Sequence, residues 1–301
     1  MIRAGIERDC PESLAMIPAP IRESVLEQFK SLDPKPTDAS LHVRILGLGR
    51  VGESLRHTFA EFGVPTVVWS RRLGTLVEHL RDDPPVKGQT ILITVSDPAI
   101  DAVAAVLAPF LDDTQVVLHC AGARAPVRIE GLDACRSGVL HPIRAIPNGQ
   151  TSLTHQVWGI SGGEAAQDRA RSVIELLEGE YVQVPREQAV LYHAAMVIAG
   201  NFPLALQAVS ESVLSTFSAQ RDVSRKALQT LHLGALRNVA DSSVEAALTG
   251  PVARRDLATI QAHLEVLSDV QPELAEWYRR TTILLANHIG WRAGVTQLER
   301  H

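Results

Sequence analysis

The sequence predicts an α/β fold in which a doubly wound parallel sheet is followed by an all-α C-terminal domain. Short apolar runs rich in Val, Ile and Leu alternate with helical patterns from Leu41 to about residue 185. That alternation is typical of parallel strands joined by helices. After Pro185 the strand signals stop, and the remaining pattern has the 3.6-residue period of helices. The chain has 301 residues, enough for about two domains.

The elements expected in the first domain follow one another from Leu41 onward. Strands are expected at 41–48, 65–69, 90–95, 115–119, 139–141, 157–161 and 181–184. Helices are expected at 50–62, 73–80, 100–111 and 165–177. Gly63 is expected to end the first of these helices, because glycine readily follows a helix C-terminus.

The second domain is expected to consist of helices at 186–200, 203–217, 223–239, 254–270 and 272–288. In the helix that Arg254 opens, four apolar residues share the face that should pack: Leu257, Ile260, Leu264 and Leu267. The predicted organisation is therefore an N-terminal extension at 1–38, an α/β domain at 39–185 and a helical domain at 186–301. The extension could form a helix at 21–32, but a packing arm or a poorly ordered terminus is favoured.

Composition excludes several classes of function. Lys and Arg number 29 against 34 Asp and Glu, a net charge of −5, so the chain lacks the basic surface that nucleic-acid binding needs. Three cysteines without paired spacing argue against a disulfide framework. The charged N-terminus does not resemble a secretion signal, and we expect a cytoplasmic protein.

The segment 189–209 has no charged residue and is long enough to cross a bilayer. It also contains His193, Asn201, Pro203 and Gln207, and no basic cluster flanks it. We therefore expect a helix buried in protein, with no membrane contact. Because its apolar surface exceeds what a small helical domain covers, we also expect the C-terminal helices to form a homodimer.

Residues Gly47, Leu48, Gly49, Arg50, Val51 and Gly52 form a G-x-G-x-x-G motif. The motif follows an expected strand and opens an expected helix, which is the context of the dinucleotide-binding turn in Rossmann folds. Its glycines let the backbone approach a pyrophosphate, and the helix N-terminus offers free N–H groups to the anion. The alternative is a glycine turn without a ligand.

Residues that follow the next strands extend this cofactor site. The second strand leads into Ser70, Arg71 and Arg72, where an NAD-preferring fold commonly has Asp or Glu for the ribose 2′-hydroxyl. A hydroxyl and two guanidiniums suit a 2′-phosphate instead, so the predicted cofactor is NADP. Ser96 with Asp97, and Ala121 with Gly122, follow the third and fourth strands, at the edge where such sheets bind ligands. The alternative for each pair is an ordinary turn between a strand and a helix.

Together these motifs resemble a family of Rossmann-type oxidoreductases whose helical C-terminal domain is catalogued as being of unknown function. Its relatives are ketopantoate reductase, pyrroline-carboxylate reductase and the 6-phosphogluconate dehydrogenase group. The likeness extends over roughly residues 41–267. It rests on GLGRVG at 47–52, SDPAI at 96–100, HCAGA at 119–123, HP at 141–142, YHAAMVIAGNF at 192–202 and ALTGPVARRD at 247–256. The resemblance implies NADP binding, a helical second domain that often dimerises, and a substrate between the domains.

One departure concerns the proton donor. The hydroxyacid dehydrogenases and ketopantoate reductase place a catalytic lysine on the first long helix after the Rossmann domain, and the expected helix 186–200 has none. Tyr192 and His193 are the nearest candidates by position. An imidazole can donate the proton that carbonyl or imine reduction requires, so we expect His193 to be catalytic. The alternative is a buried structural histidine.

Further candidates are Asn201, which either binds substrate or marks a kink, and His141, which should face the cofactor edge after its strand. Asp256, Thr259 and His263 share one helix face, and with Arg254 they could bind a carboxylate substrate or simply be solvated. No H-x-x-x-H spacing supports a metal site.

The sequence thus predicts an NADP-dependent oxidoreductase that reduces a small carbonyl or imine compound bearing a carboxylate, with ketopantoate-reductase-type activity as the most concrete candidate. Two alternatives remain open. One is a non-catalytic NADP-binding sensor or partner-binding protein, and the other is a reductase that uses another hydride carrier.

Overall fold

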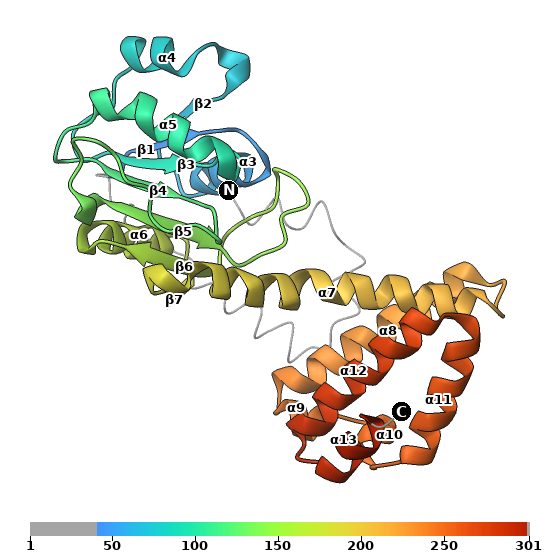
Figure 1. Cartoon of the computed structure of the whole chain (residues 1–301). Coiled ribbons are helices and arrows are strands. Elements are labelled where there is room, and N and C mark those ends of the chain that lie inside the picture. Colours follow the sequence, from blue (N-terminus) through green and yellow to red (C-terminus); the bar gives the residue numbers. More distant parts are fainter. Residues whose placement is uncertain (1–40, 300–301) are drawn as a thin grey trace, which may run out of the picture. The chain divides into compact units, whose positions relative to one another are not determined.

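The computed structural model describes residues 41–299 (Figure 1). The expected extension at 1–38, including its helix at 21–32, lies outside the described residues. The chain divides into two compact units, residues 1–201 and 202–301.

The first unit is built on one seven-stranded sheet, in the order β2-β1-β3-β4-β5-β6-β7. Its strands are β1 (Val43–Leu46), β2 (Thr66–Trp69), β3 (Thr90–Ile93), β4 (Val116–His119), β5 (Ser137–Pro142), β6 (Val157–Gly162) and β7 (Glu180–Gln183). All seven predicted strands are confirmed, and β1 to β5 pair in parallel.

The sheet differs from the prediction at one junction, because β6 runs antiparallel to β5. Parallel neighbours need a crossover connection, usually a helix. Residues 143–156, which join β5 to β6, contain no helix or strand, so the chain turns back along the neighbouring strand. The connecting loop 143–156 consequently stays at the edge of the sheet where β1, β3 and β4 end.

Helices cover both faces of this sheet (Figure 1). They are α3 (Arg50–Glu61), α4 (Leu76–Asp82), α5 (Ile100–Leu107) and α6 (Glu164–Leu176). Side chains from α3 and α6 pack with Ile45 and Leu92, whereas those from α4 and α5 pack with Ile91 and Ile93. Successive strand residues thus enter opposite cores, which explains the continuous apolar runs. The predicted α/β fold is confirmed.

The chain from residue 189 onward is helical. Its helices are α7 (Ala189–Ser215), α8 (Arg221–Ala240), α9 (Val244–Ala247), α10 (Gly250–Ala253), α11 (Leu257–Val270), α12 (Pro272–His288) and α13 (Arg292–Leu298). In the second unit, a small core gathers Val252, Ile260, Ala286, Trp291 and Leu298. The predicted helical C-terminal region is confirmed, with α9, α10 and α13 in addition.

Two helix boundaries differ from the prediction. The expected helices 186–200 and 203–217 are one helix, α7, with Pro203 inside it. A proline interrupts one backbone hydrogen bond but need not end a helix. The expected helix from Arg254 begins instead at Leu257, because Asp256 accepts hydrogen bonds from the backbone N–H and the hydroxyl of Thr259 and caps the helix.

Helix α7 is both long and apolar. Residues 186–215 contain an 18-residue window of mean hydropathy 1.6, of which 6% is buried, and by length and composition this helix could cross a membrane. Within α7 only Ala189 is buried. The expectation that protein covers this helix stays a prediction.

Arg44 is a charged residue buried in the first unit, on strand β1. Its side chain is fully shielded from solvent and forms an ion pair of 3.0 Å with Asp83. It also donates to Gln89 and lies 2.9 Å from His79 Nε2. Burial and the neighbouring guanidinium lower the pKa of His79. This cluster connects β1 to α4 and the loop after it.

We predict that Arg44→Ala lowers the free energy of unfolding by about 2–4 kcal/mol, because it leaves a cavity and leaves the partners of a buried charge unpaired. The loss is below that of a fully buried pair since Asp83 is half exposed. Arg56→Ala is the matched control: it removes an exposed ion pair with Glu53 and should change stability by less than about 0.5 kcal/mol. Denaturant unfolding that shows equal losses for both variants would contradict this account.

Candidate active site

The glycine turn between β1 and α3 is held by backbone packing. Gly47 has φ +119°, and a Cβ on it would lie 2.8 Å from the Val95 nitrogen. A Cβ on Gly52 would lie 1.9 Å from the Gly47 oxygen. The Thr94 hydroxyl donates to that same oxygen over 2.6 Å. Two glycines are thus required by the turn itself, and the start of α3 is fixed against the ends of β1 and β3.

The third glycine, Gly49, has a different environment. Among residues 41–299, no atom lies within 4 Å of a Cβ built on it, and it is the N-cap of α3 without a side-chain hydrogen bond to the helix. The first N–H groups of α3 are therefore open to a ligand and carry the positive end of the helix dipole. A tight turn, an open approach and a close helix contact are the three roles that glycines play in a dinucleotide-binding turn.

Ser70, Arg71 and Arg72 lie directly after β2, the strand beside β1. The Gly47 N–H donates to the Trp69 carbonyl over 2.9 Å, so the end of β2 borders the glycine turn. Arg71 and Arg72 are exposed, and neither forms an ion pair within the described residues. Two exposed guanidiniums thus lie beside the glycine turn.

The loop after β4 is held by two residues that sequence reasoning did not single out. His119 is buried, accepts from the Ala121 N–H at Nδ1 and lies 3.0 Å from the Ala125 oxygen at Nε2. Nε2 therefore carries the proton, and burial lowers the pKa of this histidine. Arg124 binds Asp101 and the Asp97 backbone oxygen. These contacts join the loops after β3 and β4, which carry the predicted residues Ser96, Asp97, Ala121 and Gly122.

Three predicted site residues meet at Gly122. A Cβ on Gly122 would lie 2.9 Å from both His141 Nε2 and His193 Cδ2. The two imidazole rings are 6.1 Å apart between centroids. His141 comes from β5 and His193 from α7, so the fold brings together residues 52 positions apart in the chain (193 − 141 = 52). Their closeness to the loop after β4 places both at the predicted cofactor edge.

Tyr192 completes this cluster. Its hydroxyl lies 2.8 Å from His141 Nδ1. Burial, and then the nearby His193, lowers the pKa of His141 to about 4. Burial raises the pKa of Tyr192 to about 12. The His141–Tyr192 pair is consequently neutral at pH 7, and it can hold or orient a polar group but does not release a proton readily.

A groove of about 640 Å³ opens beside these residues in the first unit. His141 and Asn201, both predicted as site residues, line it together with Arg50 and Arg144. Cys120 also lines it, and burial raises the pKa of its thiol to about 12. The thiol therefore stays protonated at neutral pH and is a poor nucleophile.

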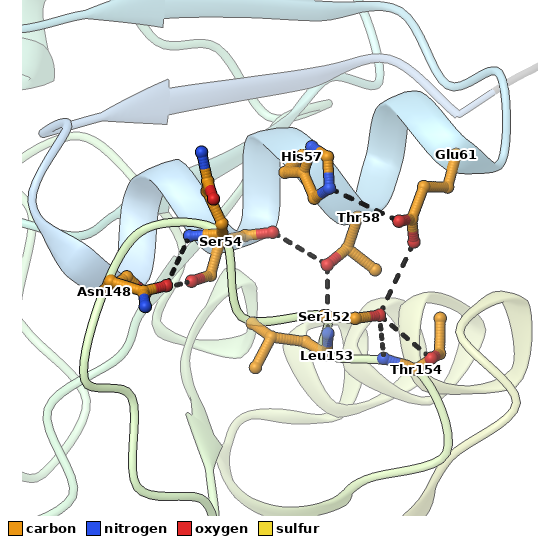
Figure 2. Close-up of polar contacts among 9 residues, drawn as sticks. Ser54, His57, Thr58, Glu61, Asn148, Ser152, Leu153 and Thr154 are labelled. Atoms are coloured by element: carbon orange, nitrogen blue, oxygen red, sulfur yellow. Dashed lines mark hydrogen bonds and ion pairs between the residues drawn. The ribbon is translucent and has the colours of Figure 1, made fainter. Parts of the chain in front are cut away.

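One wall of the groove is the loop 143–156, which is attached to α3 (Figure 2). The Ser54 hydroxyl donates to the Asn148 oxygen over 3.2 Å. Thr58 accepts from the Leu153 N–H over 3.0 Å and donates to the Ser54 oxygen. Near the end of α3, Ser152 lies 3.5 Å from Glu61. These contacts fix the loop to the same helix whose N-terminus forms the glycine turn.

The remaining predicted site residues, Arg254 and Asp256, belong to the second unit. Asp256 caps α11, and its carboxylate lies 4.0 Å from the largely exposed guanidinium of Arg254. His263, expected on the same helix face, lies 2.8 Å from the Tyr278 hydroxyl. The cap gives Asp256 a structural role, while a part in catalysis stays a prediction for both Arg254 and Asp256.

A second hollow, of about 740 Å³, lies along α11 and α12 in the second unit. Its lining includes the carboxylates of Glu265, Asp269 and Glu276. Glu276 is already paired with Arg279 and Arg280. This hollow contains none of the predicted site residues, so the groove of the first unit is the stronger candidate.

Comparisons with known proteins bear on the fold. Residues 156–284 match a family described as a domain of unknown function, DUF2520. A comparison with curated proteins finds no match.

Solved structures are similar over most of the chain. Protein TM1727 from Thermotoga maritima has a TM-score of 0.65 and 22% identity, covering 86% of this chain and all of its own. BF3122 from Bacteroides fragilis, described as a candidate NADP oxidoreductase, has a TM-score of 0.60 and 18% identity. The match covers 82% of this chain and 98% of BF3122. Pyrroline carboxylate reductase from Plasmodium falciparum, solved with NADP bound, has a TM-score of 0.51 and 11% identity. The match covers 82% of this chain and 100% of the reductase. At these identities the likeness shows a Rossmann fold followed by a helical region.

We predict that alanine at Gly49 and at Gly52 has different consequences. Gly52→Ala should cost about 1–3 kcal/mol of stability, because its Cβ would overlap the Gly47 backbone. Gly49→Ala should leave the melting temperature nearly unchanged, yet weaken NADPH binding at least about tenfold, because the methyl group occupies the approach to the turn. Gly234→Ala, in α8 and also without neighbours within 4 Å, is the control. Undiminished NADPH affinity in Gly49→Ala, measured by calorimetry, would exclude binding at this turn.

Proposed function

We propose that this chain is an NADP-dependent oxidoreductase that reduces a small carbonyl or imine compound. The observation that carries the proposal is the meeting of Gly122, His141 and His193 at the sheet edge where the glycine turn also opens. Reduction of a polar double bond needs a hydride donor and a proton donor, and a nucleotide site beside an imidazole could provide both. The likeness to reductases with TM-scores above 0.5 supports the same reading.

The residues of the turn fit a dinucleotide. Gly52 has no room for a side chain, whereas Gly49 leaves space for a pyrophosphate beside the free N–H groups of α3. Arg71 and Arg72 would bind a 2′-phosphate through charge-assisted hydrogen bonds. Reduced NADP, once bound, would supply the hydride.

We propose that His193 donates the proton that the reduction consumes. Reduction of C=O or C=N places a hydride on carbon and requires one proton on oxygen or nitrogen. In the described chain the only lysines are Lys87 and Lys226, neither of which lies in the cluster or the groove. His141 and Tyr192 are neutral partners of each other, so His193 is left as the proton donor, and the pair would hold the substrate oxygen or nitrogen in place.

We also propose that two copies of the chain pair through α7 and α8. Exposed apolar side chains follow both helices, among them Ile198, Leu204, Leu231 and Leu236. Soluble proteins rarely leave apolar patches of this extent uncovered, and a second copy would cover them in the cytoplasm. Light scattering should therefore give twice the chain mass, whereas a monomer that needs detergent to stay in solution would favour a membrane instead.

The first prediction from this function concerns cofactor choice. Charge-assisted contacts are worth about 1.5–3 kcal/mol, so native protein should bind NADPH roughly 10- to 150-fold more tightly than NADH. Arg71→Ala should remove most of that difference by weakening NADPH alone. Equal affinity of the native protein for the two cofactors, measured by calorimetry, would refute the NADP assignment.

The second prediction concerns turnover. His193→Ala should lower the rate of NADPH oxidation at least about 100-fold while NADPH affinity stays within a few-fold. The assay is stopped-flow with ketopantoate, pyrroline-5-carboxylate and a series of 2-oxo acids. Thermal melts of both proteins separate lost chemistry from lost folding. A folded variant with an unchanged rate would exclude His193 as the donor, and native protein that binds NADPH without oxidising it would favour the sensor alternative.

A further inference from the structure

We propose that Arg144 binds the carboxylate of the substrate, so that the substrates are small 2-oxo or imino acids. The inference rests on the proposed function and adds the residue that selects its substrate class. Arg144 lies on the loop 143–156, lines the groove together with His141, and is three residues from it. Three residues span at most about 11 Å, so one small molecule can reach both side chains.

The charges around the groove favour an anion. Its lining contains the two guanidiniums of Arg50 and Arg144 and no Asp or Glu. Neither guanidinium forms an ion pair or side-chain hydrogen bond with any of residues 41–299. The other titratable lining groups, His141 and Cys120, are neutral at pH 7. A carboxylate entering the groove would thus meet cationic partners without a competing anion.

The two arginines differ in what they can reach. Arg50 is the first residue of α3 and belongs to the glycine turn, so its charge is best placed for a pyrophosphate. Arg144 follows β5, on the side of the groove that carries His141. Guanidinium binds carboxylate through two parallel hydrogen bonds. A carboxylate on the carbon next to the reducible carbon would therefore be bound by Arg144 while the carbonyl or imine lies near the imidazoles.

The loop that carries Arg144 is built to hold its position. Ser54 and Thr58 anchor it to α3 at Asn148 and Leu153 (Figure 2). Gly149 packs so closely that a Cβ would lie 2.5 Å from the Glu53 Cβ. A loop fixed in this way loses little freedom when a ligand binds, which favours affinity. Exposure of Arg144 at the surface leaves its guanidinium accessible.

The test uses oxamate as an unreactive carboxylate probe and its neutral counterpart oxamide. Both are titrated by calorimetry into the full chain, alone and with NADP⁺. Native protein should bind oxamate at least about tenfold more tightly than Arg144→Gln does, and should bind oxamide weakly. Arg144→Lys should keep part of the affinity, since it retains the charge but not the paired geometry. Arg128→Gln, an exposed arginine outside the groove, is the matched control and should bind oxamate as native protein does.

Three results would overturn the proposal: equal oxamate affinity in native protein and Arg144→Gln, oxamide that binds as tightly as oxamate, or no saturable oxamate binding to native protein. NADPH titration of the same samples separates this failure from that of the proposed function. Oxamate binding that depends on Arg144 without NADPH binding would refute the oxidoreductase but not the carboxylate site. NADPH binding with oxamate affinity independent of Arg144 would refute only the carboxylate site.

Discussion

The contact between Gly52 of α3 and the carbonyl of Gly47 is the constraint on which the site depends. Because Gly52 has no side chain, the first turn of α3 packs against the end of β1, and the hydroxyl of Thr94, which directly follows β3, donates to the same carbonyl. That packing aims the open N–H groups of α3 at the carboxyl edge of the sheet. The same helix then anchors the loop 143–156 through Ser54 and Thr58. One helix thus positions both the nucleotide turn and the wall of the groove.

The reversed strand β6 explains why the groove lies at this edge. Had β6 been parallel to β5, the chain would have left through a crossover helix and returned at the opposite edge. The antiparallel pairing of Pro142 with Trp158 lets the connecting loop remain beside His141. The loop can therefore carry Arg144 and close against α3. A departure from a fully parallel sheet, which periodicity did not indicate, thus forms one wall of the groove.

Local patterns predicted most of the fold and part of the site. The strands were visible because both faces are buried, so their apolar runs are continuous, and the glycine turn was visible because backbone packing forbids side chains there. The contact of His141 with His193 could not be predicted, since no local pattern relates a β5 residue to one on α7. His119, Arg124 and Arg44 were missed for a similar reason: their partners lie elsewhere in the fold. The cap at Asp256, by contrast, can be seen in the sequence. An aspartate just before an apolar helical pattern is a common first residue of a helix cap, and it accepts from Thr259 three residues later.

The neutral pair His141–Tyr192 determines how pH acts on this site. The pKa of His141 is lowered to about 4, from an ordinary value of 6.5. As the pH falls, this imidazole therefore takes up its proton at a higher pH in the unfolded chain than in the folded one. The stability that this burial contributes is present above pH 6.5 and is lost as the pH falls from there toward 4. Between about pH 4 and pH 12 neither His141 nor Tyr192 changes its charge. A turnover that changes within this range while the fold persists must report a group other than these two. In the proposed mechanism, a neutral pair that positions the substrate and a separate imidazole that supplies the proton together take the place of the lysine.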